Sequence, residues 1–496
     1  MANAALSQDG ELHIAQMTSP PETLDPFEVY GTESQSFFRQ IFDTLISRDE
    51  EGQLKPAIAE RWEYRGNEIW RLHIRPGVVF QDGSPLTVRD VKFSLDRLLG
   101  PESVEARRRD FSFIRRVEIS DDRSVDIHTR GPISTLPARL AQFSMVLPER
   151  RLREKGEAPF FRAPIGAGPF RLVRMDRKMA VFERHEGYYQ GKPAPPRLYF
   201  HFVEDSRERL RMLLKGDLDI VPNVLPAFTR QIAEAPAVSV VKKPAQQFTY
   251  VVFDTLTPGP VADLRVRRAL AHWTDVVSLI RYVAHGNGRR IATFVMPEEF
   301  GFHPGLQPYP FDPDLARRFM AAAGYKEGFV LSALASDEID PLARAVIQQW
   351  EYLGVRTRLT VLPRAEAIQR WTKSRAYQAY LFAPTNLLLD ASYHLKSKLD
   401  PTHPVNRFHH PEATRLVQEM NRVADPDRRR EVLYRLQEIA YEYLPALALY
   451  QVVNIYGVSD RLKGFQAYPD TFLRLYHVRM VGLERPRENP AGYGAR

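Results

Sequence analysis

Residues 72–97 read LHIRPGVVFQDGSPLTVRDVKFSLDR, and this stretch predicts a strand, a tight turn and a capped helix. The β-branched and aromatic run at 78–80 is typical of a strand, and the following 81–83 supplies a turn with Gly83 where a positive φ is needed. Thr87 and Asp90 form a capping-box pattern at the start of the helix. The apolar residues of that helix follow at Val91, Leu95 and Leu98.

Two blocks around this stretch carry a resemblance to a known family. Residues 56–62 (PAIAERW) and 77–91 (GVVFQDGSPLTVRDV) closely resemble the extracytoplasmic solute-binding proteins of family 5, the oligopeptide, dipeptide and nickel receptors of ABC importers. The resemblance continues in order from about Leu12 to about Val481. Its further blocks lie at 163–170, 186–193, 214–220, 263–270, 311–317 and 322–325.

The resemblance implies an α/β, two-lobed periplasmic-binding-protein fold of the type II-like kind, with an extra domain inserted in the first lobe. The implied segments are 6–39, 165–253 and 466–496 for the first lobe, 40–164 for the inserted domain, and 254–465 for the second lobe. Segments near 253–254 and 464–465 would cross between the lobes as a hinge. Ligand would lie between the lobes and be enclosed when they close.

Length and local patterns agree with this fold class. A chain of 496 residues exceeds one hydrophobic core and indicates two to four domains. Strand and helix patterns alternate along it. Residues 311–324 predict a helix with Asp312 as N-cap, and 274–286 predict another that is capped by Thr274 or Asp275. The alternating residues 355–361 predict a strand.

The composition indicates a globular, water-soluble protein, and the resemblance implies that it acts in the periplasm. The mean hydropathy is −0.36, and no run approaches the roughly 18 apolar residues that span a bilayer. The beginning, Met1-Ala-Asn-Ala-Ala5, resembles what a signal peptidase leaves behind, so we interpret the sequence as a secretory protein whose signal peptide is absent. With no cysteine there can be no disulfide, thiolate site or acylated N-terminal cysteine, which favours a freely diffusing protein.

The charge pattern is basic but dispersed. An excess of 69 Lys and Arg over 61 Asp and Glu gives a net charge of +8, which would permit attraction to nucleic acid or anionic lipid. However, arginine clusters such as 107–109 and 428–430 alternate with acids on helix-like segments. We therefore expect no nucleic-acid partner. The resemblance implies a small solute and a membrane permease as partners, and we expect a monomer.

The motifs of common enzymes are missing. The sequence contains no G-x-S-x-G, H-E-x-x-H, Walker A or complete G-x-G-x-x-G pattern. The pairs Gly166/Gly168 and Gly286/Gly288 predict turns rather than phosphate cradles. Asp217 and Asp219 alternate with apolar residues, which predicts the outward face of a strand rather than a catalytic pair. No enzymatic activity and no cofactor are therefore expected.

The ligand is the least determined property. By resemblance, peptide receptors of the family carry an aspartate that binds the α-amino group of the ligand, and the matching position here is Leu387. Nickel receptors place a histidine where this chain has Ser392, although His394 is near. An altered ligand is thus plausible: a modified peptide, an amino-acid or sugar conjugate, an opine-like molecule or another small amphiphile, with a nickel complex as the alternative.

The segments that line the cleft in relatives supply the candidate ligand-binding residues. We expect no metal ligand among them, and for each aromatic ring a place in the core is the competing interpretation. The candidates are Tyr30, Gly31, Thr32, Arg109, Phe111, Phe143, Ser144, Phe248, Tyr250, Asn386, Leu387, Asp390 and Tyr468. The predicted function is a periplasmic receptor that captures a peptide-like or other small amphiphilic solute between two lobes and delivers it to the permease of an ABC importer.

Overall fold

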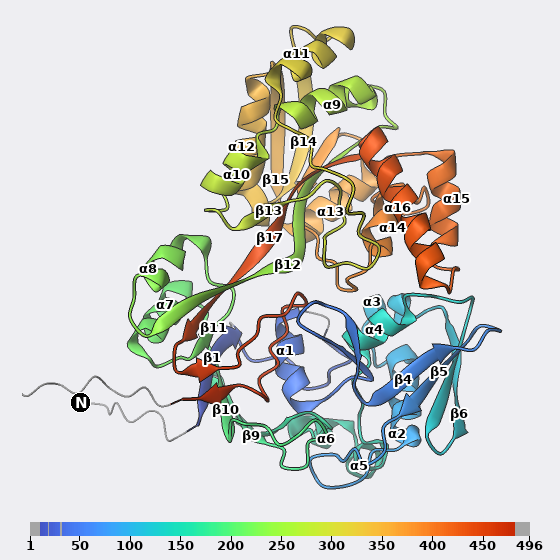
Figure 1. The fold of residues 1–496 in the computed structure, drawn as a ribbon, viewed down its shortest axis with the longest axis vertical. Coiled ribbons are helices and arrows are strands. Elements are labelled where there is room, and N and C mark those ends of the chain that lie inside the picture. The colour runs from blue at the N-terminus through green and yellow to red at the C-terminus, as the bar shows by residue number, and fades with distance from the viewer. Residues whose placement is uncertain (1–9, 18, 30–31, 482–496) are drawn as a thin grey trace, which may run out of the picture.

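The computed structural model describes residues 10–17, 19–29 and 32–481, and its architecture is mixed α/β (Figure 1). Two lobes are joined by a pair of long antiparallel strands, β12 (Val238–Phe253) and β17 (Ala446–Ser459). The α/β class and the two-lobed architecture expected from the sequence are confirmed.

The first lobe lies below the crossing strands in Figure 1 and is built on a sheet with helices against it. Its elements are β1 (Leu12–Met17), α1 (Thr32–Ile41), β8 (Phe170–Met175), β9 (Met179–Arg184), β10 (Arg197–Phe202), α7 (Ser206–Lys215), β11 (Ile220–Val221) and α8 (Thr229–Ala233). Near its C-terminal end, β18 (Leu462–Lys463) pairs with β19 (Arg479–Met480).

The segment between α1 and β8 contains a second, smaller sheet of order β4-β5-β7-β6 and five helices, and we call it the inserted domain. Its elements are β2 (Ile46–Arg48), β3 (Leu54–Pro56), β4 (Ala59–Tyr64), β5 (Ile69–Ile74), α2 (Val88–Leu99), α3 (Glu105–Asp110), β6 (Ile114–Asp121), β7 (Ser124–Thr129), α4 (Leu136–Phe143), α5 (Glu149–Lys155) and α6 (Glu157–Arg162). The exact domain boundaries stay a prediction.

In the second lobe, helices lie on both faces of the sheet (Figure 1). Its elements are α9 (Leu264–Trp273), α10 (Val276–Tyr282), β13 (Gly288–Arg290), α11 (Pro313–Ala322), β14 (Phe329–Ser336), α12 (Asp340–Glu351), β15 (Val355–Leu362), α13 (Arg364–Lys373), β16 (Ala379–Phe382), α14 (Ser392–Leu399), α15 (Pro411–Glu419) and α16 (Pro426–Tyr443).

One sheet runs through both lobes. Within the described residues its order is β15-β14-β16-β12-β17-β11-β1-β10-β9-β8, with β13 also paired to β17, so β16 joins the second lobe to β12 and β11 joins the first lobe to β17. The β12–β17 pairing shifts register between Pro244 and Phe248. Phe253 pairs with Ala379 inside the second-lobe sheet, so the crossing expected near 253–254 lies at the second-lobe end of β12.

The hydrophobic cores follow this division only in part. Leu12 and Ile14 of β1 belong to the same buried cluster as Trp70 and Leu72 of β5, so the first lobe and the inserted domain share one core. The second lobe has two further clusters, one containing Trp350 and the other containing Trp371. Because the inserted domain has no core of its own, it should move with the first lobe as one body.

Most local sequence predictions are confirmed. Helix α2 begins at Val88, and the backbone N–H of Thr87 donates to Asp90 Oδ2 at 2.8 Å. Asp312 accepts from the backbone N–H of Leu315 at the start of α11, and strand β15 spans the alternating residues. The strand expected at 78–80 is not formed, because Val79 makes only an isolated bridge, with Pro85 across the turn.

The interpretation of Asp219 is wrong. Its side chain is 1 % exposed, accepts from the backbone N–H of His13 at 2.9 Å and pairs with Arg461 at 2.7 Å. The reason is that β11 covers only Ile220–Val221, so the alternation of a strand does not extend back to Asp217. Asp219 instead ties β1 to the end of β17.

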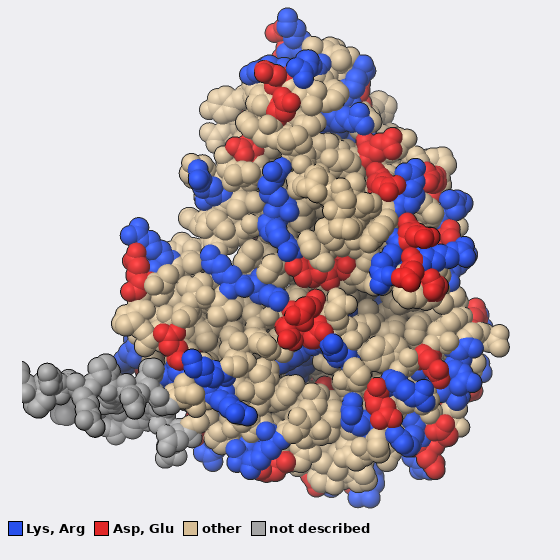
Figure 2. Space-filling view, viewed as in Figure 1, with Lys and Arg blue, Asp and Glu red and all other residues tan. Residues whose placement is uncertain are grey.

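The surface carries charges of both signs. In Figure 2, Lys and Arg side chains are interspersed with Asp and Glu over the visible face, and a hollow separates the second lobe from the part below it. Among the described residues no helix is long and apolar enough to cross a membrane.

The first prediction concerns the cap of α2. Asp90 accepts from the backbone N–H groups of Thr87 and Glu149, at 2.8 and 2.9 Å, and is buried. Asp90→Ala leaves these donors without a partner and should lower the free energy of unfolding by about 2 kcal/mol. Chemical denaturation followed by far-UV circular dichroism measures this. Asp96→Ala is the matched control, since Asp96 lies on the exposed face of the same helix; an equal loss in both variants would contradict the assigned role.

Candidate functional site

A cavity of about 570 Å³ lies between the inserted domain and the second lobe, and we call it the interlobe cavity. Its first wall comes from the inserted domain and its second from the loops and helix α16 of the second lobe. The first wall includes Arg48, Gly52, Leu54, Trp62, Glu63, Tyr64, Trp70, Ser134 and Ala138; the second includes Glu298, Phe300, Leu388, Leu389, Asp390, Ala424, Pro426 and Arg429. This combination of apolar rings and a few charged groups is typical of a small-molecule site.

Aromatic rings dominate the first wall. Trp62 and Tyr64 lie on β4, and Trp70 lies on the neighbouring strand β5. The rings of Tyr64 and Trp70 are 5.5 Å apart, and the indole N–H of Trp70 donates to the carbonyl of Pro132 at 2.5 Å. Because the polar tip of Trp70 is satisfied, its ring is held as an apolar surface beside the cavity.

The second wall depends on a buried ion pair. Asp390 receives two hydrogen bonds from Arg429, both of 2.7 Å, and further ones from the backbone and hydroxyl of Ser392. Burial by itself would raise the pKa of Asp390, but Arg429 and Ser392 hold it below its ordinary value. The carboxylate is therefore charged and already paired within the protein, so its role is to fix the loop 386–390.

The two walls touch at the edge of the cavity. Arg48 donates to the carbonyl of Leu388 at 2.5 Å, and the Ser134 hydroxyl donates to the carbonyl of Val423 at 2.5 Å. A Cβ atom at Gly52 would lie 2.8 Å from a methyl carbon of Leu389, and Gly52 has a φ of +84°. Glycine is therefore required here, both for the close approach and for the backbone conformation.

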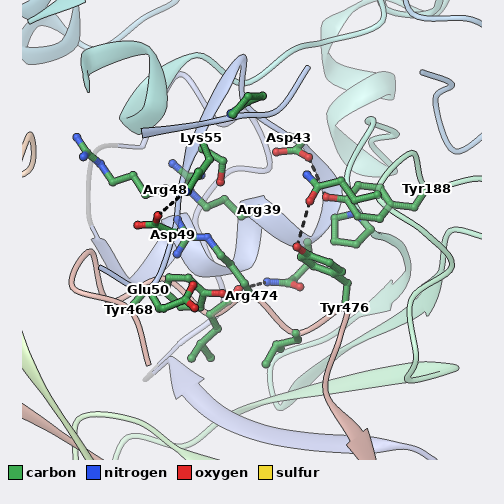
Figure 3. Close-up of a pocket in the computed structure, with 17 residues that line it drawn as sticks. Arg39, Asp43, Arg48, Asp49, Glu50, Lys55, Tyr188, Tyr468, Arg474 and Tyr476 are labelled. Carbon is green, nitrogen blue, oxygen red and sulfur yellow. Dashed lines mark hydrogen bonds and ion pairs between the residues drawn. The ribbon is translucent and has the colours of Figure 1, made fainter. Parts of the chain in front are cut away.

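A second, smaller cavity of about 220 Å³ lies between the first lobe and the inserted domain, and we call it the polar cavity. Figure 3 shows Arg39 and Arg474 close together in it, with Tyr188 and Tyr476 on one side. Its charged and aromatic lining consists of Arg39, Asp43, Arg48, Asp49, Glu50, Lys55, Tyr188, Tyr468, Arg474 and Tyr476. Arg48 lines both cavities, so they adjoin at this side chain.

The structure brings only some predicted residues to these cavities. Asp390 lines the interlobe cavity and Tyr468 lines the polar cavity. Asn386 is buried beside them and donates to the carbonyl of Asp390 at 3.0 Å. Leu387 belongs to the core shared by the first lobe and the inserted domain, although it comes from the second lobe. An apolar contact between lobes thus takes the place of the expected ammonium-binding acid.

Other predicted residues lie away from the cavities. The rings of Phe111, Phe143, Phe248 and Tyr250 are at most 2 % exposed and belong to the hydrophobic cores. Ser144 ends α4, where its hydroxyl donates to the carbonyl of Leu140.

The remaining predictions concern α1 and α3. Arg109 is exposed on α3. Tyr30 and Gly31 lie outside the described residues, and Thr32 begins α1 without a described side chain. Direct contact of these residues with a solute stays a prediction.

The sequence argument missed most of the cavity lining. Trp62 could have been found, because it ends the family block at 56–62 and is an aromatic residue on a strand. The arginines of the two cavities could not have been found, because they are spread over more than 400 residues and nothing nearby marks them among 69 basic residues. They are Arg39, Arg48, Arg429 and Arg474.

Comparison with known proteins shows which family the chain belongs to. The model of the bacterial extracellular solute-binding proteins, family 5, matches residues 53–404. The chain belongs to this family. Heme-binding protein A of Haemophilus influenzae is 24 % identical and matches 92 % of this chain and 89 % of its own; the glutathione-binding protein GsiB of Salmonella typhimurium is 27 % identical over 68 % and 67 %. The structure of HbpA2 from Haemophilus parasuis is similar with a TM-score of 0.87, at 20 % identity, over 95 % of this chain and 100 % of that one.

Membership in family 5 fixes the general role of the molecule. The family consists of the substrate-binding receptors of ABC importers, which are not enzymes, and they act in the periplasm. In a family 5 receptor the two lobes and the cavity between them have a direct use, because such proteins hold a solute for their permease.

A buried lysine of this family 5 receptor, Lys398, lies on α14. Lys398 is 3 % exposed, and its ammonium lies 4.7 Å from the centre of the Tyr250 ring and 5.4 Å from that of Phe382. Its one hydrogen bond goes to the hydroxyl of Ser397 at 3.0 Å. Burial lowers the pKa of Lys398 to about 7, because an ammonium loses its hydration there.

This lysine predicts a pH dependence. In the unfolded chain the pKa of a lysine is about 10.4, so between pH 7 and 10 the unfolded state binds the extra proton. The free energy of unfolding should therefore rise with pH over this interval. Lys398→Met should flatten that rise, as measured by denaturation at several pH values. Lys396→Met is the control, since Lys396 is exposed on the same helix; an unchanged slope in Lys398→Met would show that the ammonium is not buried.

Proposed function

We propose that this family 5 receptor encloses one small amphiphilic solute between its inserted domain and its second lobe and delivers it to the membrane permease. The observation that supports this most directly is the interlobe cavity, which takes one aromatic wall and one mixed wall from the two sides of the β12–β17 crossing. Its volume suits a compound of the size of a short peptide, an opine or a sugar conjugate.

The chain is proposed to act as a periplasmic monomer without covalent chemistry and without a nucleic-acid partner. Interspersed charges on the surface in Figure 2 support the last point, because nucleic-acid sites need a basic stripe or patch. The aromatic lining supports a solute with an apolar part. Asp390 is already paired with Arg429, which argues against an ordinary peptide whose amino group would pair with Asp390.

Lobe closure around a solute is testable in solution. Glutathione, heme and a library of short peptides are screened by thermal shift, and small-angle scattering is recorded with each stabilising compound. The radius of gyration should fall at saturation and the melting temperature should rise by mass action. Ala138→Trp, which fills the interlobe cavity, should lose both effects, whereas Ala321→Trp on the exposed face of α11 should keep them. An unchanged radius at saturation would remove the case for closure.

Nickel is the second candidate solute, and we expect it not to bind. Ser392 stands at the position that the resemblance gives to the histidine of nickel receptors, and its hydroxyl donates to Asp390. His394 is buried, with its ring 4.7 Å from that of Phe248 and 5.0 Å from that of Tyr393. Elemental analysis of the purified protein should find well under one equivalent of nickel. One equivalent that is lost in His394→Gln, but kept in His409→Gln, would reverse this assignment.

A further inference from the structure

Three arginines in the polar cavity have one carboxylate between them. Arg474 forms a two-bond ion pair with Asp470, at 2.9 and 2.6 Å. Arg39 and Arg48 are buried, and no carboxylate oxygen of the described residues lies within 4.0 Å of either guanidinium. Buried charges in proteins are normally paired, yet these two positive charges have no carboxylate in direct contact, and the guanidinium of Arg39 lies over the ring of Phe472 at 4.6 Å.

The hydrogen bonds of these two arginines do not supply the missing charge. Arg39 donates to the carbonyls of Ala141 and Gln142 at the end of α4, at 2.7 and 3.2 Å. Arg48 donates to the carbonyls of Gly52 and Leu388, at 2.6 and 2.5 Å. These carbonyls are dipoles without net charge, and the Nε atom of each arginine has no partner. Both groups stay charged at neutral pH although burial lowers the pKa of each to about 10.

Of the acids that line the cavity, Asp43 and Asp49 bond to other groups. Asp43 accepts from the hydroxyls of Tyr188 and Tyr189, at 2.9 and 2.8 Å, and burial raises its pKa, which favours the neutral form. Asp49 pairs with Lys55 at 2.9 Å. Glu50 also lines the cavity but makes no ion pair with Arg39 or Arg48. None of these acids is therefore in direct contact with Arg39 or Arg48.

We propose that the solute of this receptor is a carboxylic acid, whose carboxylate enters the polar cavity beside Arg39 and Arg48. The less polar part of the solute then lies against Trp62 and Trp70 in the interlobe cavity. Arg48 makes this possible because it lines both cavities and touches the second lobe through Leu388. This inference rests on the proposed function and narrows it to acidic solutes.

The test uses a library of short peptides and N-acyl amino acids, each prepared as the free acid and as the primary amide. Thermal shift finds the binders, and calorimetry then gives the affinity of each matched pair. The free acid should bind at least about tenfold more tightly than its amide, since a charge-assisted hydrogen bond to a guanidinium is lost in the amide. Arg39→Gln and Arg48→Gln should abolish this preference. Arg211→Gln, on the exposed face of α7, should leave it unchanged.

The outcomes separate the alternatives. Arg48→Lys keeps the charge and should keep most of the preference for acids, which a purely structural loss would not do. Equal weakening of acid and amide in Arg39→Gln and Arg48→Gln would show that these arginines only support the fold, and would overturn the proposal, as would equal binding of acids and amides by the unmodified protein. Failure of every acid and every amide to bind would count against the receptor function itself, and the proposal would fall with it.

Discussion

The arrangement of the two lobes depends on the antiparallel pairing of β12 with β17. In the second lobe β16 pairs with β12 and the short strand β13 pairs with β17, while the first lobe joins the sheet through the pairing of β11 with β17, so the β12–β17 ladder links the sheets of the two lobes. The inserted domain follows the first lobe because they share a core. The geometry that results is two bodies with a cavity between them, and the contacts of Arg48 and Ser134 are made across that gap.

The cavity between the lobes and the arginines that have no carboxylate in contact lie at different places in the molecule. The interlobe cavity has one wall of aromatic rings and one mixed wall, and Asp390 of the mixed wall is already paired with Arg429. Charge without an internal partner is found in the polar cavity instead, at Arg39 and Arg48. The scaffold that holds the two walls and the charged groups that could select a solute are therefore separate parts of the molecule.

Sequence reasoning succeeded where the signal is local or spans long ordered blocks. The capping pattern of Thr87 and Asp90, the cap at Asp312 and the family blocks predicted elements and fold correctly. It failed where the outcome depends on contacts between distant segments. Phe248 and Tyr250 have the composition of pocket residues but are core residues, and Asp219 has the spacing of a strand residue but is a buried tie between strands. No local pattern could show that Arg39, Arg48 and Arg474 meet.

The register shift in β12 changes which groups the crossing strands bond to at this point. Pro244 lies opposite Val453 and Phe248 opposite Gln451, so three residues of β12 face one of β17. There the side-chain amide of Gln451, rather than a backbone group, donates to the carbonyl of Ala245 at 2.8 Å. The next residues bond to the second lobe instead, because the carbonyl of Gln246 accepts from the backbone N–H of Asn386 and Gln247 forms an isolated bridge with Thr385. The loop that forms part of the second cavity wall is therefore fastened to the strand that joins the lobes.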